Sequence, residues 1–137
     1  MVDVAQESMG VSEENPHVVR SSRTVSASPA QVWGHLVESS GTEALLGPGA
    51  SLGTKGESWH SSSGAFGVVR SYHPLEQLRV SWHAHADAPA SLVDLHVIAE
   101  GSGTRLDLVH ERLAPGDPEA DLQQYWDGAL ARFAAEL

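Results

Sequence analysis

The chain has 137 residues, and its 18 Asp and Glu against 8 Lys and Arg give a formal net charge of −10. A chain of this length predicts one domain with its own hydrophobic core. The absence of Cys excludes disulfides and Cys-ligated zinc. The scattered single cations argue against binding to nucleic acid or to an anionic membrane surface. No apolar stretch approaches the ~20 residues that span a bilayer, and we see no secretory pattern, so we expect a cytoplasmic protein without membrane insertion.

The first segment of the chain differs in composition from the rest. Residues 1–15 are acidic and polar and lack sustained periodicity, which predicts a flexible tail. The remainder, residues 16–137, is predicted to be a single domain. Its first strand is expected over residues 17–27, where valines alternate with polar side chains.

A helix start follows this strand. Ser28 can serve as the N-cap, Pro29 fits the first helical position, and Gln31 can complete a capping box. The Ser-Ser-Gly sequence at 39–41 is expected to interrupt this helix. A second short helical turn is then predicted over residues 42–46.

From Leu52 onward the hydrophobic period changes from that of a helix to two. Alternation of this kind indicates half-buried strands, and the Ser-Ser-Ser-Gly sequence at 61–64 is a plausible hairpin turn. Five strands are predicted, over residues 53–60, 65–73, 78–83, 93–98 and 104–112.

The last segment, residues 118–137, predicts one long amphipathic helix. It follows an expected N-cap at Asp117 and a helix-starting Pro118. No other long helix is present in the pattern, so its apolar stripe is expected to lie across the sheet and to enclose a pocket. The stripe consists of Leu122, Tyr125, Trp126, Ala129, Leu130, Phe133 and Leu137.

Four short motifs occur in the order found in one protein family. Residues 25–33 are similar to its opening pattern "apolar-x-A-x-P-x-x-V-W", and residues 67–82 resemble its strand pair "G-x-V … P-x-x-x-L-x-x-x-W". Residues 103–110 resemble "G-T-x-L-x-L-x-H", and Trp126 with Leu130 resembles "G-W-x-x-x-L". The family is that of homologues of the activator of the 90-kDa heat-shock-protein ATPase, within the START-like (SRPBCC) superfamily. The resemblance covers about residues 17–137.

This resemblance implies an α+β helix-grip fold. In it, a curved antiparallel sheet of about six strands wraps around a long C-terminal helix, with two short helices after the first strand. The superfamily includes ligand carriers, aromatase/cyclases and chaperone regulators, so the fold alone does not choose among them. Two departures from the family pattern lie near the expected pocket mouth: residues 45–49 lack its usual Trp, and Tyr125 replaces its usual Gly.

His110 is the sharpest candidate for polar chemistry. It shares a strand face with Leu106 and Leu108, so it is expected to point into the apolar interior. There it could orient a polar ligand group or act as a base. The favoured alternative is a core histidine whose ring nitrogens are bonded to a backbone or hydroxyl partner.

The aromatic residues are the other candidates for a pocket wall, although core filling would explain them as well. Trp82 is assigned to the core. The predicted ligand-binding set is Trp59, Tyr72, His110, Tyr125, Trp126 and Leu130.

Metal binding and catalysis find little support in the sequence. His83 and His85 are two residues apart on one face of a strand, a spacing that two zinc ligands can have. A third ligand would come from His96 or Asp94. A solvent-facing position is the favoured interpretation, so no metal, cofactor or catalytic residue is predicted.

The leading functional hypothesis is a non-enzymatic protein that binds a small hydrophobic or amphipathic molecule, lipids included, between sheet and helix. The second is a protein-interaction domain with a chaperone partner, as the family name implies. The third is a cyclase, hydratase or hydrolase that uses His110 or a Tyr in the cavity.

Overall fold

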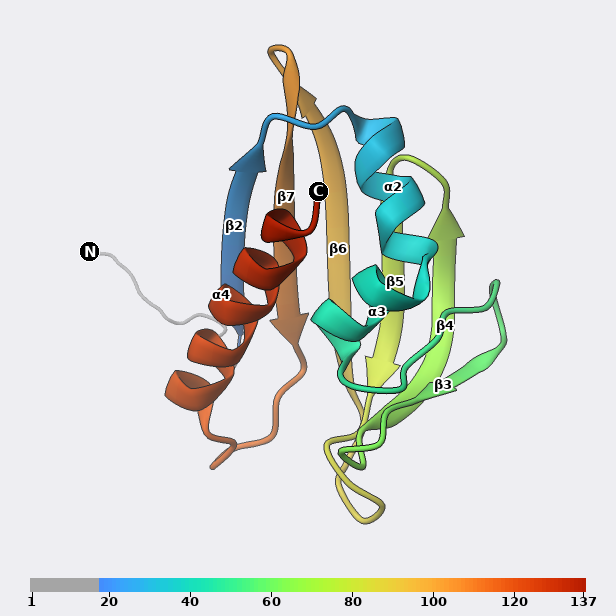
Figure 1. The fold of residues 1–137 in the computed structure, drawn as a ribbon. Helices are drawn as coiled ribbons and strands as arrows, with labels where there is room; N and C mark the ends of the chain where they lie inside the picture. Colours follow the sequence, from blue (N-terminus) through green and yellow to red (C-terminus); the bar gives the residue numbers. More distant parts are fainter. Residues whose placement is uncertain (1–17) are drawn as a thin grey trace, which may run out of the picture.

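The computed structural model describes residues 18–137 as one antiparallel sheet with helices packed on one of its faces (Figure 1). The predicted tail at residues 1–15 lies outside the described residues. In chain order the elements are β2 (Val19–Val25), α2 (Pro29–Val37), α3 (Ser39–Leu46), β3 (Ser58–His60), β4 (Phe66–His73), β5 (Gln77–Trp82), β6 (Ser91–Glu100), β7 (Gly103–Glu111) and α4 (Glu119–Ala135). This is the predicted helix-grip architecture.

The strand order in the sheet is β2-β7-β6-β5-β4-β3. Strands β3 to β7 are joined as successive hairpins. Strand β2, the first in the chain, lies at the edge opposite β3, beside β7. The register pairs Leu95 with Leu108 and Val93 with His110. Because side chains alternate along a strand, these residues all face the helices, and their neighbours face outward.

The capping box predicted at the start of α2 is confirmed. The backbone N–H of Gln31 donates to Ser28 Oγ at 3.3 Å, and the backbone N–H of Ser28 donates to Gln31 Oε1 at 2.9 Å. Two of the unpaired donors at this helix end are therefore satisfied locally.

The predicted interruption at residues 39–41 is wrong, because these residues form the first turn of α3. The break between α2 and α3 is confined to Glu38, whose backbone is extended. Gly41 explains how the turn fits: a Cβ there would lie 1.8 Å from the His35 carbonyl oxygen. The absent side chain lets α3 fold back directly onto the end of α2.

Other boundaries also differ from prediction, and two of the differences have a clear local cause. Strand β3 begins only at Ser58, because residues 54–57 form a turn in which the Glu57 carboxylate accepts from the Thr54 N–H at 2.8 Å. Helix α4 begins at Glu119 with Pro118 as its N-cap. Asp117 does not cap the helix, since its carboxylate accepts from the Ala114 N–H at 2.7 Å.

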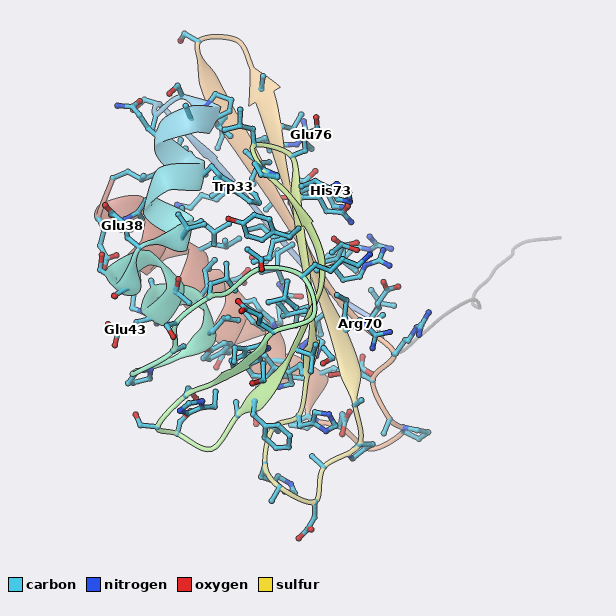
Figure 2. All side chains as sticks on the ribbon, turned by 90° about the vertical axis from the view of Figure 1, so that its right-hand side faces the viewer. Trp33, Glu38, Glu43, Arg70, His73 and Glu76 are labelled. Atoms are coloured by element: carbon cyan, nitrogen blue, oxygen red, sulfur yellow. The ribbon has the colours of Figure 1, made fainter. Side chains whose placement is uncertain are left out.

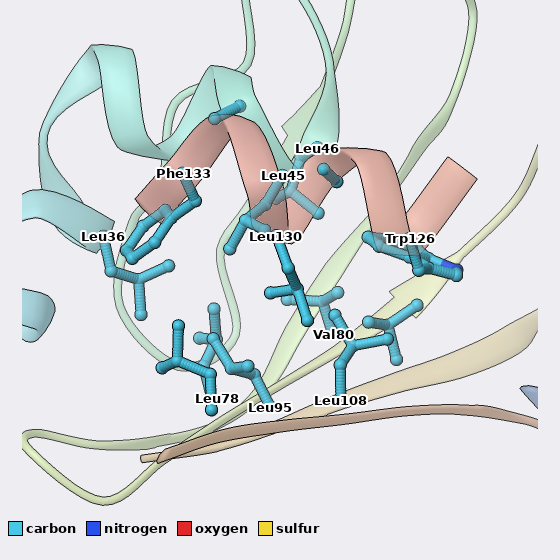
Figure 3. Close-up of a cluster of buried hydrophobic side chains, with 14 of the residues drawn as sticks. Leu36, Leu45, Leu46, Leu78, Val80, Leu95, Leu108, Trp126, Leu130 and Phe133 are labelled. Carbon is cyan, nitrogen blue, oxygen red and sulfur yellow. The ribbon is translucent and has the colours of Figure 1, made fainter. Parts of the chain in front are cut away.

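The core lies between the helices and the inner face of the sheet. Helix α4 buries Trp126, Leu130 and Phe133, which face Leu95 and Leu108 of the sheet (Figure 3). These residues of the predicted apolar stripe therefore pack on the sheet as their spacing predicts, but Leu137 does not, because α4 ends at Ala135 and Leu137 is exposed beyond it.

The outer face of the sheet is polar, with Arg70, His73 and Glu76 pointing away from the helices (Figure 2). One outward residue, Asp94, is nevertheless buried. Burial alone would raise the pKa of its carboxyl, but hydrogen bonds from Gln77 at 2.9 Å and Arg79 at 3.0 Å, with the charges of His96 and Arg79, lower it overall.

Candidate functional site

The space between the helices and the sheet holds a small enclosed cavity, which we call the inner cavity and whose helical wall comes from α2, α3 and Trp126 of α4. It has a volume of about 20 Å³ and is lined by apolar side chains, among them Leu46, Val80, Leu108 and Trp126. Its one polar lining residue, Thr42, already donates to the Leu36 carbonyl at 2.7 Å. A space this small holds no more than a water molecule, and it offers that molecule few partners.

A second cavity, the end cavity, lies where the β5–β6 loop meets the β7–α4 loop. Its volume is about 90 Å³. Its walls are mainly apolar, with Trp82 and Leu122 among them, and its polar lining residues are Ser91, His110 and Asp117. A mostly apolar wall with a few converging polar groups is typical of a small-molecule site.

The polar groups of the end cavity form a hydrogen-bonded chain. Trp126 Nε1–H donates to His110 Nδ1 at 3.1 Å, and His110 Nε2 lies 2.7 Å from Ser91 Oγ. The Ser91 hydroxyl donates in turn to the Trp82 carbonyl at 3.2 Å. Because Nδ1 accepts, the ring proton is on Nε2 and is donated to Ser91.

His110 is fully buried, with 0% of its surface exposed. Burial lowers its pKa from 6.5 to about 4, although the nearby Asp117 carboxylate acts in the opposite direction. The ring is therefore neutral at neutral pH, and both of its nitrogens have partners. This is the hydrogen-bonded core histidine favoured by the sequence, in a position that also lines the end cavity.

The two cavities are separated by aromatic rings. Trp82 lines the end cavity and Trp126 lines the inner cavity, and their ring centroids are 5.2 Å apart in an edge-to-face arrangement. Trp82 also contacts the rings of Trp59 at 5.4 Å and His110 at 5.7 Å.

The structure brings three of the six predicted ligand-binding residues together, because Trp126 is hydrogen-bonded to His110 and packs edge-on against Tyr125 at 4.8 Å. Leu130 is buried between α4 and the sheet, where it packs in the core (Figure 3). Tyr72 lies apart from both cavities, with its ring edge-on to Trp33 at 5.5 Å. A ligand role for any of these residues stays a prediction.

Trp59 is held away from the cavities by a contact across strand β4. Its indole N–H donates to the Ser81 carbonyl at 3.1 Å, passing over Gly67. A Cβ at Gly67 would lie 1.9 Å from that carbonyl oxygen and 2.8 Å from the indole nitrogen. The Val68 N–H donates instead to Ser81 Oγ at 2.9 Å, so the serine side chain replaces its own carbonyl in the ladder.

Tyr125 faces α3. Its hydroxyl donates to the Leu45 carbonyl at 2.9 Å, and Arg132 donates to the Ala44 carbonyl at 3.1 Å. Burial raises the pKa of Tyr125, partly offset by the charge of Arg132. Both residues line an open surface hollow of about 520 Å³, which we call the α3–α4 groove.

Ser91 and Asp117 are the polar residues of the end cavity that were not predicted as site residues. Ser91 could have been found, because it begins the inward-facing series that continues through Val93 and Leu95. The position of Asp117 directly before Pro118 predicts a helix cap, so the sequence gives no sign of its hydrogen bond from the Ala114 N–H.

The possible zinc ligands are not assembled. His83 stacks on Phe66 with ring centroids 4.6 Å apart, and its Nδ1 lies 2.9 Å from the Ala88 carbonyl oxygen. Within residues 18–137, no three His, Asp or Glu side chains are grouped as a metal ion would require. In the same part of the chain, no helix has both the length and the apolar character needed to cross a membrane.

Comparisons with known structures agree on the fold. DynU16, a protein of the dynemicin biosynthetic locus, has a TM-score of 0.75 at 22% identity, covering 87% of this chain and 46% of DynU16. CalU16 from Micromonospora echinospora has a TM-score of 0.70 at 23% identity, covering 86% of this chain and 73% of that one. The Aha1 dimer from Colwellia psychrerythraea has a TM-score of 0.73 at 16% identity, covering 88% and 95%.

At these identities the similarity concerns the fold alone, and the chain spans less than half the length of DynU16. No curated protein matches the chain significantly in sequence. The family model described as "Activator of Hsp90 ATPase homolog 1-like protein" matches residues 26–137, which is most of the chain. The chain therefore belongs to the Activator of Hsp90 ATPase homolog 1-like family.

Proposed function

We propose that this protein is a non-enzymatic binding protein that holds a small amphipathic molecule between the sheet and helix α4. The observation that carries the proposal is the end cavity, in which Ser91 and His110 lie within a mainly apolar wall beside the inner cavity. Both nitrogens of His110 are already hydrogen-bonded, which supports an orienting role over that of a free base.

The polar groups of the end cavity indicate the chemistry of the ligand. Ser91 Oγ accepts a hydrogen bond from His110 Nε2 and donates one to the Trp82 backbone carbonyl. One of the two acceptor positions of the Ser91 oxygen therefore stays open. Asp117 adds a carboxylate, and no Lys or Arg is among the described residues that line this cavity. These groups favour a neutral ligand that donates a hydrogen bond, such as an alcohol or phenol, and disfavour a carboxylate or phosphate.

The size of the cavities limits the ligand further. A volume of 90 Å³ is well below the ~300 Å³ at which drug-sized pockets begin. A ligand head could occupy the end cavity while its apolar tail displaces the Trp126 ring toward the inner cavity. A short alkylphenol has both parts.

The test is a titration with 4-butylphenol, followed by calorimetry and by tryptophan fluorescence, with its methyl ether as the matched control ligand. We expect the phenol to bind about fivefold more tightly than the ether, the difference that one hydrogen bond makes. In Ser91→Ala that preference should disappear. If neither compound binds or changes the fluorescence, the proposal is wrong.

A second candidate is a protein-interaction role with a chaperone partner, which is supported by membership of the family. Its test is a titration with a bacterial homologue of the 90-kDa chaperone, monitored by NMR shifts of this chain and by the ATPase rate of the partner. An unchanged spectrum and an unchanged rate would remove this candidate.

A further inference from the structure

The last turn of helix α3 separates the inner cavity from the α3–α4 groove. Leu45 and Leu46 line the inner cavity, whereas Glu43, Ala44 and Gly47 line the groove. These residues are consecutive, so one turn of helix forms the wall between an apolar space of 20 Å³ and an open hollow of 520 Å³.

Two side chains of α4 hold this turn in place. The last carbonyls of any helix lack partners within the helix. In α3, the Leu45 carbonyl accepts from the Tyr125 hydroxyl, and the Ala44 carbonyl accepts from the Arg132 guanidinium. The guanidinium lies 6.0 Å from the centre of the Tyr125 ring, so the two side chains form one unit, which we call the latch.

The segments on either side of the turn are anchored elsewhere. Before it, Thr42 Oγ1 donates to the Leu36 carbonyl and fixes α3 to α2. After it, Pro48 accepts hydrogen bonds from the backbone and side chain of Ser62. Between the turn and this second anchor lies Gly47, whose φ of 111° is a conformation open to glycine. The Glu43 carboxylate accepts from the Gly49 N–H at 2.7 Å, so movement of the last turn at Gly47 breaks this contact while the Thr42 and Pro48 anchors stay.

We propose that the last turn of α3 is the lid of the interior, and that release of the Tyr125–Arg132 latch opens the route by which the ligand enters. The lid rests on the proposed function, because the inner cavity that it closes adjoins the proposed ligand site across Trp82 and Trp126. The closed inner cavity admits no organic molecule, so a ligand that enters there has to displace Leu45 and Leu46. Outward movement of this turn joins the inner cavity to the groove and provides that space.

The test compares Tyr125→Phe with Tyr72→Phe. Both changes remove one phenolic hydroxyl and keep the ring, but Tyr72 packs on Trp33 and does not contact α3 in the latch. Amide hydrogen exchange at residues 45–47 of the free protein should be about fivefold faster in Tyr125→Phe, as expected for loss of one hydrogen bond. Exchange in β6 and β7 should not change, and Tyr72→Phe should resemble the original protein throughout.

The second measurement is the stopped-flow rate of 4-butylphenol binding, followed by tryptophan fluorescence. In Tyr125→Phe, association and dissociation should both be about fivefold faster, with the dissociation constant nearly unchanged. Arg132→Met, which keeps the aliphatic stem, should have the same effect.

Each contrary result is distinct. Unchanged exchange at residues 45–47 in both latch variants would overturn the lid and leave the proposed function standing. Faster exchange with unchanged binding rates would show that the turn moves but is not the route of entry, which also overturns the inference. Absence of any probe binding would overturn the proposed function, and the entry route with it.

Discussion

The indole nitrogen of Trp126 donates a hydrogen bond of 3.1 Å to Nδ1 of His110, and this contact links helix α4 to the protonation state of a fully buried ring. A protonated histidine carries hydrogen on both nitrogens and has no acceptor to offer. Proton uptake by His110 would therefore remove the partner of the Trp126 N–H and place a charge in the core.

The first prediction concerns the pH dependence of stability. The pKa of His110 is about 4 when folded and 6.5 in its ordinary state, so the unfolded chain binds more protons between these values. The free energy of unfolding should thus fall as the pH drops from 6.5 toward 4, by about 3 kcal/mol from this group. Urea denaturation across this range measures it.

The control for this prediction is His110→Asn, which cannot titrate but keeps an acceptor in its side chain. Other histidines contribute equally to both proteins, so the difference between the two curves isolates His110. Parallel curves for the original protein and the variant would contradict the assignment.

The second prediction is that Ser91→Ala destabilises the fold. It leaves the Nε2–H of His110 without an acceptor in a buried place, which costs about 1–3 kcal/mol. Calorimetric melting measures the loss. Ser102→Ala, in the exposed β6–β7 turn, is the matched control and should change stability by less than about 0.5 kcal/mol. Equal melting temperatures for both variants would show that the Ser91 contact contributes nothing.

Local patterns were sufficient to predict the order of the elements. The capping box at Ser28 and the spacing of the apolar side chains in α4 depend on residues within one or two turns of each other. The same applies to the inward position of His110, which follows from strand alternation with Leu106 and Leu108.

The cavities could not be predicted in this way. Their volumes depend on how side chains from four or more elements fill a shared space, to within the size of a methyl group. The hydrogen bond of Tyr125 could not be predicted for another reason, because its partner is the backbone carbonyl of Leu45, 80 residues away in the chain. Backbone acceptors carry no side-chain signature, so the apolar stripe of α4 favoured a pocket wall instead.

The third prediction concerns the start of α2. Ser28→Ala should lower the free energy of unfolding by about 1 kcal/mol, because the N–H of Gln31 loses its acceptor. Chemical denaturation checks this value. Ser28→Asp should restore most of the loss, since a carboxylate also caps, and the exposed Ser26→Ala should have little effect. A loss that Asp does not restore would argue against capping as the cause.

The fourth prediction concerns the buried carboxylate on the outer face. Asp94→Asn should destabilise the protein by about 1–3 kcal/mol at neutral pH, because Arg79 and Gln77 lose a charged acceptor. Since the folded pKa of Asp94 is lowered, its contribution is present above 3.8 and is lost as the pH falls through the folded value. The variant should therefore converge with the original protein in strong acid.

The matched control on the same face is Asp107→Asn. Asp107 pairs with Arg105 at 3.2 Å in a more exposed setting, where such pairs contribute little. Urea denaturation of both variants should show a clearly larger loss for Asp94. A similar loss at the two positions would mean that burial of Asp94 does not strengthen its contacts.

The crossing of the Trp59 indole over Gly67 has a consequence for how this domain can diversify. The end cavity is built largely from loop residues, whose side chains can be exchanged without disturbing a strand ladder. At Gly67 any added carbon meets a carbonyl oxygen and an indole nitrogen at once. A saturation scan of the gene should therefore find Gly67 intolerant of every replacement while the loop positions of the end cavity vary widely, so that new ligand preferences can arise in the loops while the strand pairing beside them stays fixed.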